Sequence, residues 1–228
     1  MSQIPLSLRK KLSYDPKSFI WHEGLKEIQE NVLAKKSKKI FRPYFIQGAA
    51  RSGKTHLSFA IAEKFRSQGL DIKLISGHQQ FLGCLEKNNF LEAEVIIFDA
   101  AEETLKELSP EGSGAMIDFF EQAKSAANTL LIISSDHYSA ANLDQHLLSR
   151  FKLMNEMSIA DPSDKEVVDL ISALALQRGM KLKAQQLSYV APRLPKVIED
   201  IEQFLERLSY LAVSSNSSIN RTTISKAL

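Results

Sequence analysis

Apolar and alternating runs along the chain predict the strands of a parallel sheet. Phe41–Gln47 is apolar and aromatic, and Val95–Phe98 is apolar throughout. Asp71–Ser76 alternates polar with apolar positions, Thr129–Ile133 is a further apolar run, and a short strand is predicted over 156–159. Continuous apolar runs are typical of strands that are covered on both faces. The pattern therefore predicts a buried sheet of parallel strands.

Apolar residues at spacings of three and four predict helices between these strands. The predicted helices cover residues 23–37, 54–67, 78–90, 115–127 and 143–148. Strands that alternate with helices along a chain are typical of the α/β class. We therefore predict an α/β domain over residues 14–159.

After residue 159 only helical periodicity remains. Asp161 and Pro162 are predicted to be the N-cap and first residue of a helix. The remaining helices are predicted over 184–191, 195–212 and 222–228. Residues 160–228 are therefore expected to form a small α-helical domain.

The first 13 residues have the pattern of an extended peptide. Its apolar and amide side chains are Gln3, Ile4, Leu6 and Leu8. Pro5 lies among them and opposes a helix. A short peptide of this kind can pack on its own domain or dock on another protein, and the residues alone leave both alternatives open.

Composition narrows the class of protein. The net charge of +2 gives no strong field that would favour nucleic acid. The single cysteine, Cys84, excludes an internal disulfide and suits a reducing compartment. No apolar run approaches the roughly 18 residues that span a bilayer, and the N-terminus lacks the apolar core of a secretion signal. We therefore expect a cytoplasmic protein.

A phosphate-binding loop is predicted between the first strand and the helix that begins near residue 54. The segment reads Gly48-Ala49-Ala50-Arg51-Ser52-Gly53-Lys54-Thr55, followed by His56, and has the spacing G-x-x-x-x-G-K-[ST]. Glycines let successive N–H groups turn toward an anion, and the helix start adds positive potential. Lys54 is expected to reach the outer phosphates, and Thr55 to offer its hydroxyl to Mg²⁺. These residues predict a site for ATP or ADP with Mg²⁺; the alternative is an ordinary glycine-rich turn.

Asp99 ends the most apolar strand and is expected at the edge of the sheet where ligands bind in α/β folds. There its carboxylate can orient water on Mg²⁺ next to Thr55. The next residue, Ala100, cannot activate water. Glu102 is the nearest substitute as a catalytic acid, but it is equally explained as a carboxylate at a helix N-terminus.

Two further sets of polar residues follow predicted elements. Ser134, Ser135 and Asp136 end the strand that begins at Thr129, and can either sense an outer phosphate or cap the strand. Arg150 lies at a helix end, within the segment Leu147-Leu148-Ser149-Arg150-Phe151. It can form a surface ion pair, or its planar guanidinium can reach a nucleotide held by another subunit.

The order of these motifs resembles the AAA+ ATPases, and most of all the DnaA clade. The resemblance covers roughly residues 15–212. The segment Leu131–Asp136 resembles the sensor 1 strand of that clade, which implies a phosphate-sensing role for Ser135 and Asp136. The segment Leu147–Phe151 resembles its Box VII, which implies that Arg150 is an arginine finger. The fold implied is a P-loop core with a parallel sheet, followed by a helical lid.

Two features narrow the resemblance. Gln3 to Leu8 resembles the Gln-Leu-x-Leu-x-Leu peptides that dock in the bacterial sliding clamp. The sequence ends at Leu228, just after the predicted helical lid, so we do not expect the helix-turn-helix domain with which DnaA reads DNA. Within this clade, the combination implies a regulator of replication initiation whose partners are the clamp and DnaA. DNA would be met through the clamp, and the sequence leaves open whether a second copy of the chain is a further partner.

The chain departs from the clade at two positions. Ala100 replaces an acid, and Pro195 stands where the clade has the sensor 2 arginine. Arg193 and Lys196 are the nearby cations. Both departures weaken hydrolysis more than binding, so little turnover of the chain's own nucleotide is expected. The alternatives are a helicase-loader-like ATPase that remodels DNA and a DnaA-like tethering protein.

Overall fold

The computed structural model describes residues 16, 19–34, 40–108, 113–126, 129–214 and 219–228. The chain divides into two compact units. One is Gly24–Ala160, and the other combines the residues before Gly24 with Asp161–Leu228. The predicted clamp-binding residues Gln3, Ile4, Leu6 and Leu8 lie outside the described residues.

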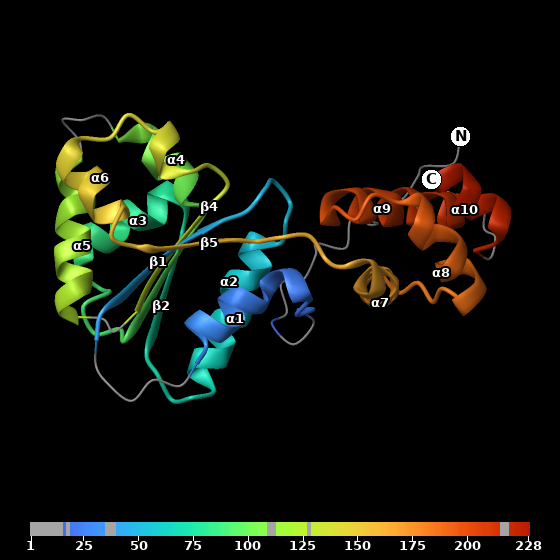
Figure 1. The fold of residues 1–228 in the computed structure, drawn as a ribbon, viewed down its shortest axis with the longest axis horizontal. Helices are drawn as coiled ribbons and strands as arrows, with labels where there is room; N and C mark the ends of the chain where they lie inside the picture. Colours follow the sequence, from blue (N-terminus) through green and yellow to red (C-terminus); the bar gives the residue numbers. More distant parts are fainter. Residues whose placement is uncertain (1–15, 17–18, 35–39, 109–112, 127–128, 215–218) are drawn as a thin grey trace. The chain divides into compact units, whose positions relative to one another are not determined.

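The unit Gly24–Ala160 is built on a five-stranded sheet in the order β2-β3-β4-β1-β5 (Figure 1). The strands are β1 (Arg42–Gln47), β2 (Ile72–Ser76), β3 (Val95–Asp99), β4 (Thr129–Ser134) and β5 (Asn155–Ser158). Every neighbouring pair is parallel. The predicted α/β class with a parallel sheet is therefore confirmed.

Helices cover both faces of this sheet. They are α1 (Lys26–Val32), α2 (Lys54–Arg66), α3 (Gly77–Lys87), α4 (Ala101–Glu107), α5 (Gly114–Ala126) and α6 (Gln145–Phe151), with 3-10 turns η3 (Glu23–Leu25) and η5 (Tyr138–Ala140). Figure 1 shows α1 and α2 on one side of the sheet and α3 to α6 on the other. Helix α4 is not predicted by the hydrophobic pattern.

The alternation of side chains along β3 decides where Asp99 points. Phe98 is fully buried and stacks on Phe81 of α3 with ring centroids 5.1 Å apart. Successive residues of a strand face opposite sides, so Asp99 shares the other face with Ile97. That face is covered by α2, the helix that follows the predicted phosphate loop.

The second unit is helical. Its elements are α7 (Asp164–Gln177), α8 (Ala184–Val190), η6 (Ala191–Arg193), α9 (Ile198–Ser214) and α10 (Arg221–Ala227). Its own core includes Ile171, Phe204 and Leu208, each with no exposed surface. Ile20 packs against this core, which explains why the residues just before Gly24 group with this unit although the predicted α/β domain began at residue 14.

Helix α7 begins later than the sequence predicts. Asp161 is not its N-cap; Ser163 is, in a capping box with Glu166. The Glu166 carboxylate accepts the Ser163 N–H at 3.0 Å and the Glu23 N–H at 2.7 Å. A carboxylate that satisfies two backbone donors stabilises the helix start at Ser163, so the prediction from Asp161 and Pro162 was wrong by two residues.

Candidate functional site

The loop that follows β1 is anchored on both sides by backbone hydrogen bonds. The Gly48 N–H donates to the Ser134 carbonyl of β4 at 3.1 Å, and the Ile159 N–H donates to the Gln47 carbonyl at 2.8 Å. Gly53 then takes a left-handed conformation with φ of 86° and leads into α2. Only glycine adopts that region without strain. The loop therefore turns directly from a central strand into a helix N-terminus.

The start of the loop has no room for a side chain at Gly48. A Cβ added there would lie 2.5 Å from Ser52 Oγ and 2.9 Å from Ile159 Cδ1. The Ser52 hydroxyl is buried and has no hydrogen-bond partner within the part of the chain that the structure describes. A buried polar atom of this kind is costly unless it finds a partner. The tight backbone and the available hydroxyl both fit a phosphate group.

The remaining loop residues take different positions. Ala50 and Arg51 are exposed, and Arg51 has a positive φ of 56°. Thr55 and His56 lie half-buried in the first turn of α2. All predicted loop residues therefore lie around the end of β1.

Lys54 is the cation at the centre of the site. Its Nζ donates to the carbonyl oxygens of Gly48 at 3.1 Å and Ala49 at 2.7 Å. Burial lowers the pKa of Lys54, and the carboxylates of Glu102, Asp99 and Asp136 act in the opposite direction. Those carboxylates come from α4, β3 and the segment after β4. The fold therefore gathers four of the predicted site residues at one edge of the sheet.

Asp99 is almost completely buried, with 2 % of its surface exposed. Burial raises the pKa of Asp99, while hydrogen bonds from the side chains of Thr55 and Ser58 and from the Ala100 N–H oppose the rise. Its Oδ1 has no partner among the described residues. An acceptor-only group next to the Thr55 hydroxyl fits water molecules on Mg²⁺.

Ser58 is a site residue that the sequence did not single out. Its hydroxyl is fully buried and also lies 3.0 Å from the Lys54 carbonyl. A hydroxyl has one proton, so Ser58 can donate to only one of Asp99 and Lys54 at a time. The sequence signal that could have identified Ser58 is its position among the apolar residues on the buried face of α2.

The described residues contain no group of three or more His, Cys, Asp or Glu side chains that could hold a metal ion by themselves. Mg²⁺ commonly binds through one or two protein oxygens together with phosphates and water. Thr55 and Asp99 therefore fit Mg²⁺ as partners of a bound nucleotide rather than as a separate metal cage.

Helix α4 is tied to the end of β4 by two of its side chains. Glu102 Oε2 accepts the Ser135 N–H at 3.1 Å, and Lys106 Nζ lies 2.6 Å from Asp136 Oδ2. The Ser134 hydroxyl further fixes the turn by donating to the Asp136 carbonyl at 2.7 Å. Glu102 thus contacts the predicted sensor segment, and Lys106 is a partner that sequence reasoning missed.

Ala100 links Asp99 to α4 in an unusual backbone conformation. Its φ of 54° and ψ of 45° are left-handed. For a residue with a Cβ this costs on the order of 1 kcal/mol. The turn directs Glu102 of the next helix toward the site, where it accepts from Ser135.

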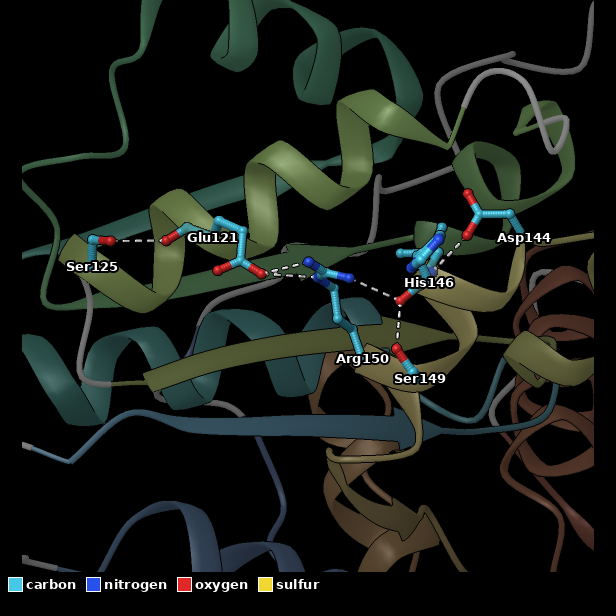
Figure 2. A network of polar contacts seen from close by, with 7 residues as sticks. Glu121, Ser125, Asp144, His146, Ser149 and Arg150 are labelled. Atoms are coloured by element: carbon cyan, nitrogen blue, oxygen red, sulfur yellow. Dashed lines mark hydrogen bonds and ion pairs between the residues drawn. The ribbon is translucent and has the colours of Figure 1, made fainter.

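Arg150 does not join this group. Its Nε and Nη2 donate to Glu121 Oε1 of α5 at 3.0 and 2.7 Å, and its Nη1 donates to the His146 carbonyl at 2.9 Å (Figure 2). Asp144 caps the same helix by accepting the Leu147 N–H at 2.8 Å. Glu121 was not singled out in the sequence, because its spacing from Arg150 of 29 residues carries no local pattern.

The residues near Pro195 have partners within the helical unit. The Arg193 guanidinium lies 4.0 Å from the Tyr189 ring centroid, and its Nη1 donates to the Tyr189 carbonyl at 2.7 Å. Lys196 Nζ lies 2.6 Å from Asp164 Oδ1. Both cations that could replace a sensor 2 arginine are therefore engaged.

No helix among the described residues is long and apolar enough to span a membrane.

The sequence of the chain is similar to part of the chromosomal replication initiator protein DnaA. No protein-family model matches the chain. Over 223 residues the chain is 23 % identical to the chromosomal replication initiator protein DnaA of Buchnera aphidicola, covering 86 % of this chain and 47 % of the relative. With DnaA of Thermus thermophilus it shares 24 % identity over 86 % of this chain and 48 % of the relative. The chain thus spans about half the length of the curated relatives it matches.

Solved structures agree in fold. Domain III of the Thermotoga maritima replication initiation protein DnaA has a TM-score of 0.72 at 17 % identity, covering 94 % of this chain and 95 % of that one. AMPPCP-bound DnaA from Aquifex aeolicus has a TM-score of 0.65 at 20 % identity, covering 87 % and 65 %. A Thermotoga maritima RuvB variant has a TM-score of 0.65 at 17 % identity, covering 92 % and 69 %. The chain therefore has the AAA+ fold and is DnaA-like in sequence.

Proposed function

We propose that this chain is a nucleotide-binding, DnaA-like regulator of chromosome replication initiation, of the kind represented by Hda. In this proposal it binds the sliding clamp through its N-terminus and presents Arg150 to ATP held by DnaA. The observation that carries the nucleotide-binding part is the arrangement of Lys54 with three carboxylates around a loop whose first glycine admits no side chain. The similarity to DnaA supports the replication context.

The proposed ligand is ATP or ADP with Mg²⁺. The loop Gly48–Thr55 would hold the phosphates through its backbone N–H groups, the Ser52 hydroxyl and the Lys54 ammonium. Thr55 and Asp99 would hold Mg²⁺, which supplies charge neutralisation for the phosphates when bound. The AMPPCP bound to the DnaA structure with a similar fold supports an adenine nucleotide as the ligand class.

Little turnover of this nucleotide is expected. Ala100 has no group that can take a proton from water, and the Glu102 carboxylate accepts the Ser135 N–H. A carboxylate held in this way is better placed to link α4 to the segment after β4 than to activate water. We therefore assign Glu102 a positioning role in preference to a catalytic one.

Arg150 is proposed to act on a partner's nucleotide. A guanidinium supplied by a second protein stabilises charge on the phosphoryl group being transferred, which accelerates hydrolysis by roughly 10³- to 10⁵-fold in well-studied NTPases. Contacts of Arg150 with Glu121 and His146 keep it apart from the Lys54 site in its own chain. This separation supports action in trans.

The first experiment is binding of the chain to the bacterial sliding clamp, with the double variant Gln3→Ala/Leu6→Ala as control. We expect micromolar or tighter binding that the double variant loses. Absence of binding by the unaltered chain would remove the clamp from the proposal and favour a helicase-loader-like or tethering module.

The second experiment measures ATP hydrolysis by DnaA in the presence of the chain and clamp-loaded DNA. We expect stimulation that Arg150→Ala abolishes while the chain's own nucleotide affinity stays unchanged. Stimulation that survives in Arg150→Ala would reject the arginine finger.

A further inference from the structure

We propose that Glu121 restrains Arg150, so that the arginine finger must leave an ion pair within its own chain before it reaches a partner's nucleotide. This inference rests on the proposed function of Arg150. It assigns Glu121 a regulatory role at the same site.

The contact with Glu121 occupies the edge of the Arg150 guanidinium that would otherwise bind an anion. Nε and Nη2 of Arg150 form one edge of its planar fork, and both donate to Glu121 Oε1, at 3.0 and 2.7 Å. Paired donors along one edge are the arrangement with which arginine binds carboxylates and phosphates. Because Glu121 occupies this edge, the carboxylate occupies the position that a phosphate oxygen would take.

A second contact holds the other side of the fork. Nη1 of Arg150 donates to the His146 carbonyl at 2.9 Å, one helical turn earlier in α6 (Figure 2). The Ser149 hydroxyl donates to the same carbonyl at 2.7 Å. With both Nη atoms and Nε engaged, the side chain is folded back onto α5 and α6.

The helices that carry the pair are fixed independently of it. Asp144 caps α6, and Phe151 packs against Phe120 of α5 with ring centroids 5.3 Å apart. Phe151 has no exposed surface. Removing the Glu121 carboxylate is therefore expected to free the Arg150 side chain without displacing the helix that carries it.

Exposure makes the restraint weak and reversible. The side chains of Arg150 and Glu121 are 27 % and 55 % exposed. Ion pairs as exposed as this shift an equilibrium by about 1.5- to 5-fold. Glu121 also lines a shallow surface recess with Leu91, Gln122, Ser125 and Ala126, so an arriving protein can contact it. A phosphate in a water-excluded interface binds the same edge of the guanidinium more strongly than Glu121 does, and therefore displaces Glu121 from Arg150.

The test uses Glu121→Gln, which keeps the side-chain shape and removes the charge. Asp118→Asn is the matched control, because Asp118 is an exposed carboxylate on the same helix α5. The first measurement is proton exchange at Arg150 Nε–H by NMR in the full chain. Exchange should be about 1.5- to 5-fold faster in Glu121→Gln and unchanged in Asp118→Asn.

The second measurement is stimulation of DnaA ATP hydrolysis at a limiting concentration of the chain, with clamp-loaded DNA. Stimulation should rise about 1.5- to 5-fold in Glu121→Gln and stay unchanged in Asp118→Asn. Equal or lower stimulation in Glu121→Gln, or unchanged exchange, overturns the restraint.

The arrangement of variants separates this inference from the proposed function. Stimulation that is lost in Arg150→Ala but unchanged in Glu121→Gln leaves the finger intact and overturns only the restraint. Stimulation that survives in Arg150→Ala overturns the finger, and the restraint with it.

Discussion

Burial determines the chemistry of the two charged residues closest to the predicted phosphate loop. Lys54 and Asp99 both have pKa values moved by burial toward their neutral forms, Lys54 downward and Asp99 upward. Nearby carboxylates limit the fall of the Lys54 pKa. Hydrogen bonds donated to the Asp99 carboxylate limit the rise of its pKa. In the proposed complex a phosphate would add negative charge beside Lys54 and Mg²⁺ would add positive charge beside Asp99, so each ligand would favour the charged form that burial opposes.

Lys54→Ala should weaken nucleotide binding by about 3 kcal/mol, or roughly 100-fold, because it removes a charge-assisted contact in a partly buried site. Isothermal titration calorimetry with ADP and Mg²⁺ measures the change. The control is Lys64→Ala, an exposed lysine in the last turn of the same helix. Equal affinity in Lys54→Ala and the unaltered chain would reject the phosphate-loop assignment.

Asp99→Asn should raise the free energy of unfolding by about 1 kcal/mol at neutral pH, because a buried charge is replaced by a neutral group of the same shape. The pKa of Asp99 is raised in the folded chain above 3.8, so its ionisation costs stability above that raised value. As pH falls through the folded pKa toward 3.8, the carboxylate becomes neutral and the difference should vanish.

Urea unfolding of both chains between pH 4 and 8 measures this difference. The same variant should lose the part of nucleotide affinity that depends on Mg²⁺. A variant that is less stable than the unaltered chain at pH 7 would contradict the sign.

At the scale of elements, the segment that leads from β4 to α6 is fixed by aromatic packing. Tyr138 stacks on Phe151 with ring centroids 4.9 Å apart, and Phe45 of β1 packs edge-on against both rings. The Tyr138 hydroxyl also donates a hydrogen bond to Glu156 of β5. This packing holds the helix that carries Arg150 against the sheet.

Tyr138→Phe should lower the free energy of unfolding by about 1 kcal/mol at pH 8, since it removes one partly buried hydrogen bond. Burial, together with Glu156, raises the pKa of Tyr138 to about 12. The unfolded chain loses this proton first, so the stabilisation is complete below pH 10 and is lost as pH rises toward about 12. The difference between the two chains should therefore narrow between pH 10 and 11.

Denaturant unfolding at pH 8, 9, 10 and 11 follows this difference. A difference in free energy of unfolding that stays constant from pH 8 to 11 would show that folding does not raise the pKa of Tyr138. The N-cap residue Asp144 gives a comparison on the same segment. Its hydrogen bond with the Leu147 N–H does not involve the Tyr138 hydroxyl, so loss of the Tyr138 proton should leave it unchanged.

The sequence predicts elements better than it predicts their contacts. The strands, the loop and Asp99 follow from runs and spacings that are local in the chain. Lys106 with Asp136 and Glu121 with Arg150 are 30 and 29 residues apart, so only the packing of α4 and α5 reveals them. The start of α7 was missed because two N-terminal patterns overlap in the sequence, and the helix begins with the capping box of Ser163 and Glu166.

At the scale of the whole molecule, each of the two units has buried residues of its own that pack together. The core of Gly24–Ala160 contains Phe81, Phe98 and Phe119, whereas that of the helical unit contains Phe204. Units with separate cores can unfold in separate transitions. A probe that lies in one unit therefore reports the stability of that unit.

The only tryptophan, Trp21, belongs with the helical unit. We expect its fluorescence to follow that unit and far-UV circular dichroism to follow both, so the two urea transitions should not coincide. Nucleotide at about 100 times its dissociation constant stabilises the unit that binds it by about 2.7 kcal/mol. Coincident transitions in the absence and presence of nucleotide would show that the two units unfold as one.

The position of β1 inside the sheet has a consequence for amide hydrogen exchange. Strands β3, β4 and β1 are each paired on both sides, whereas β2 and β5 form the edges. Amides of β3, β4 and β1 should exchange only when the sheet itself opens, and those of the edges through local fraying. The backbone that leads into Gly48, Ala100 and Ser135 is thus expected to exchange more slowly than the edge strands. Binding of a ligand should therefore slow exchange first at the amides that follow these strands. Because the strand amides already exchange slowly without ligand, the change should be confined to the residues of the site.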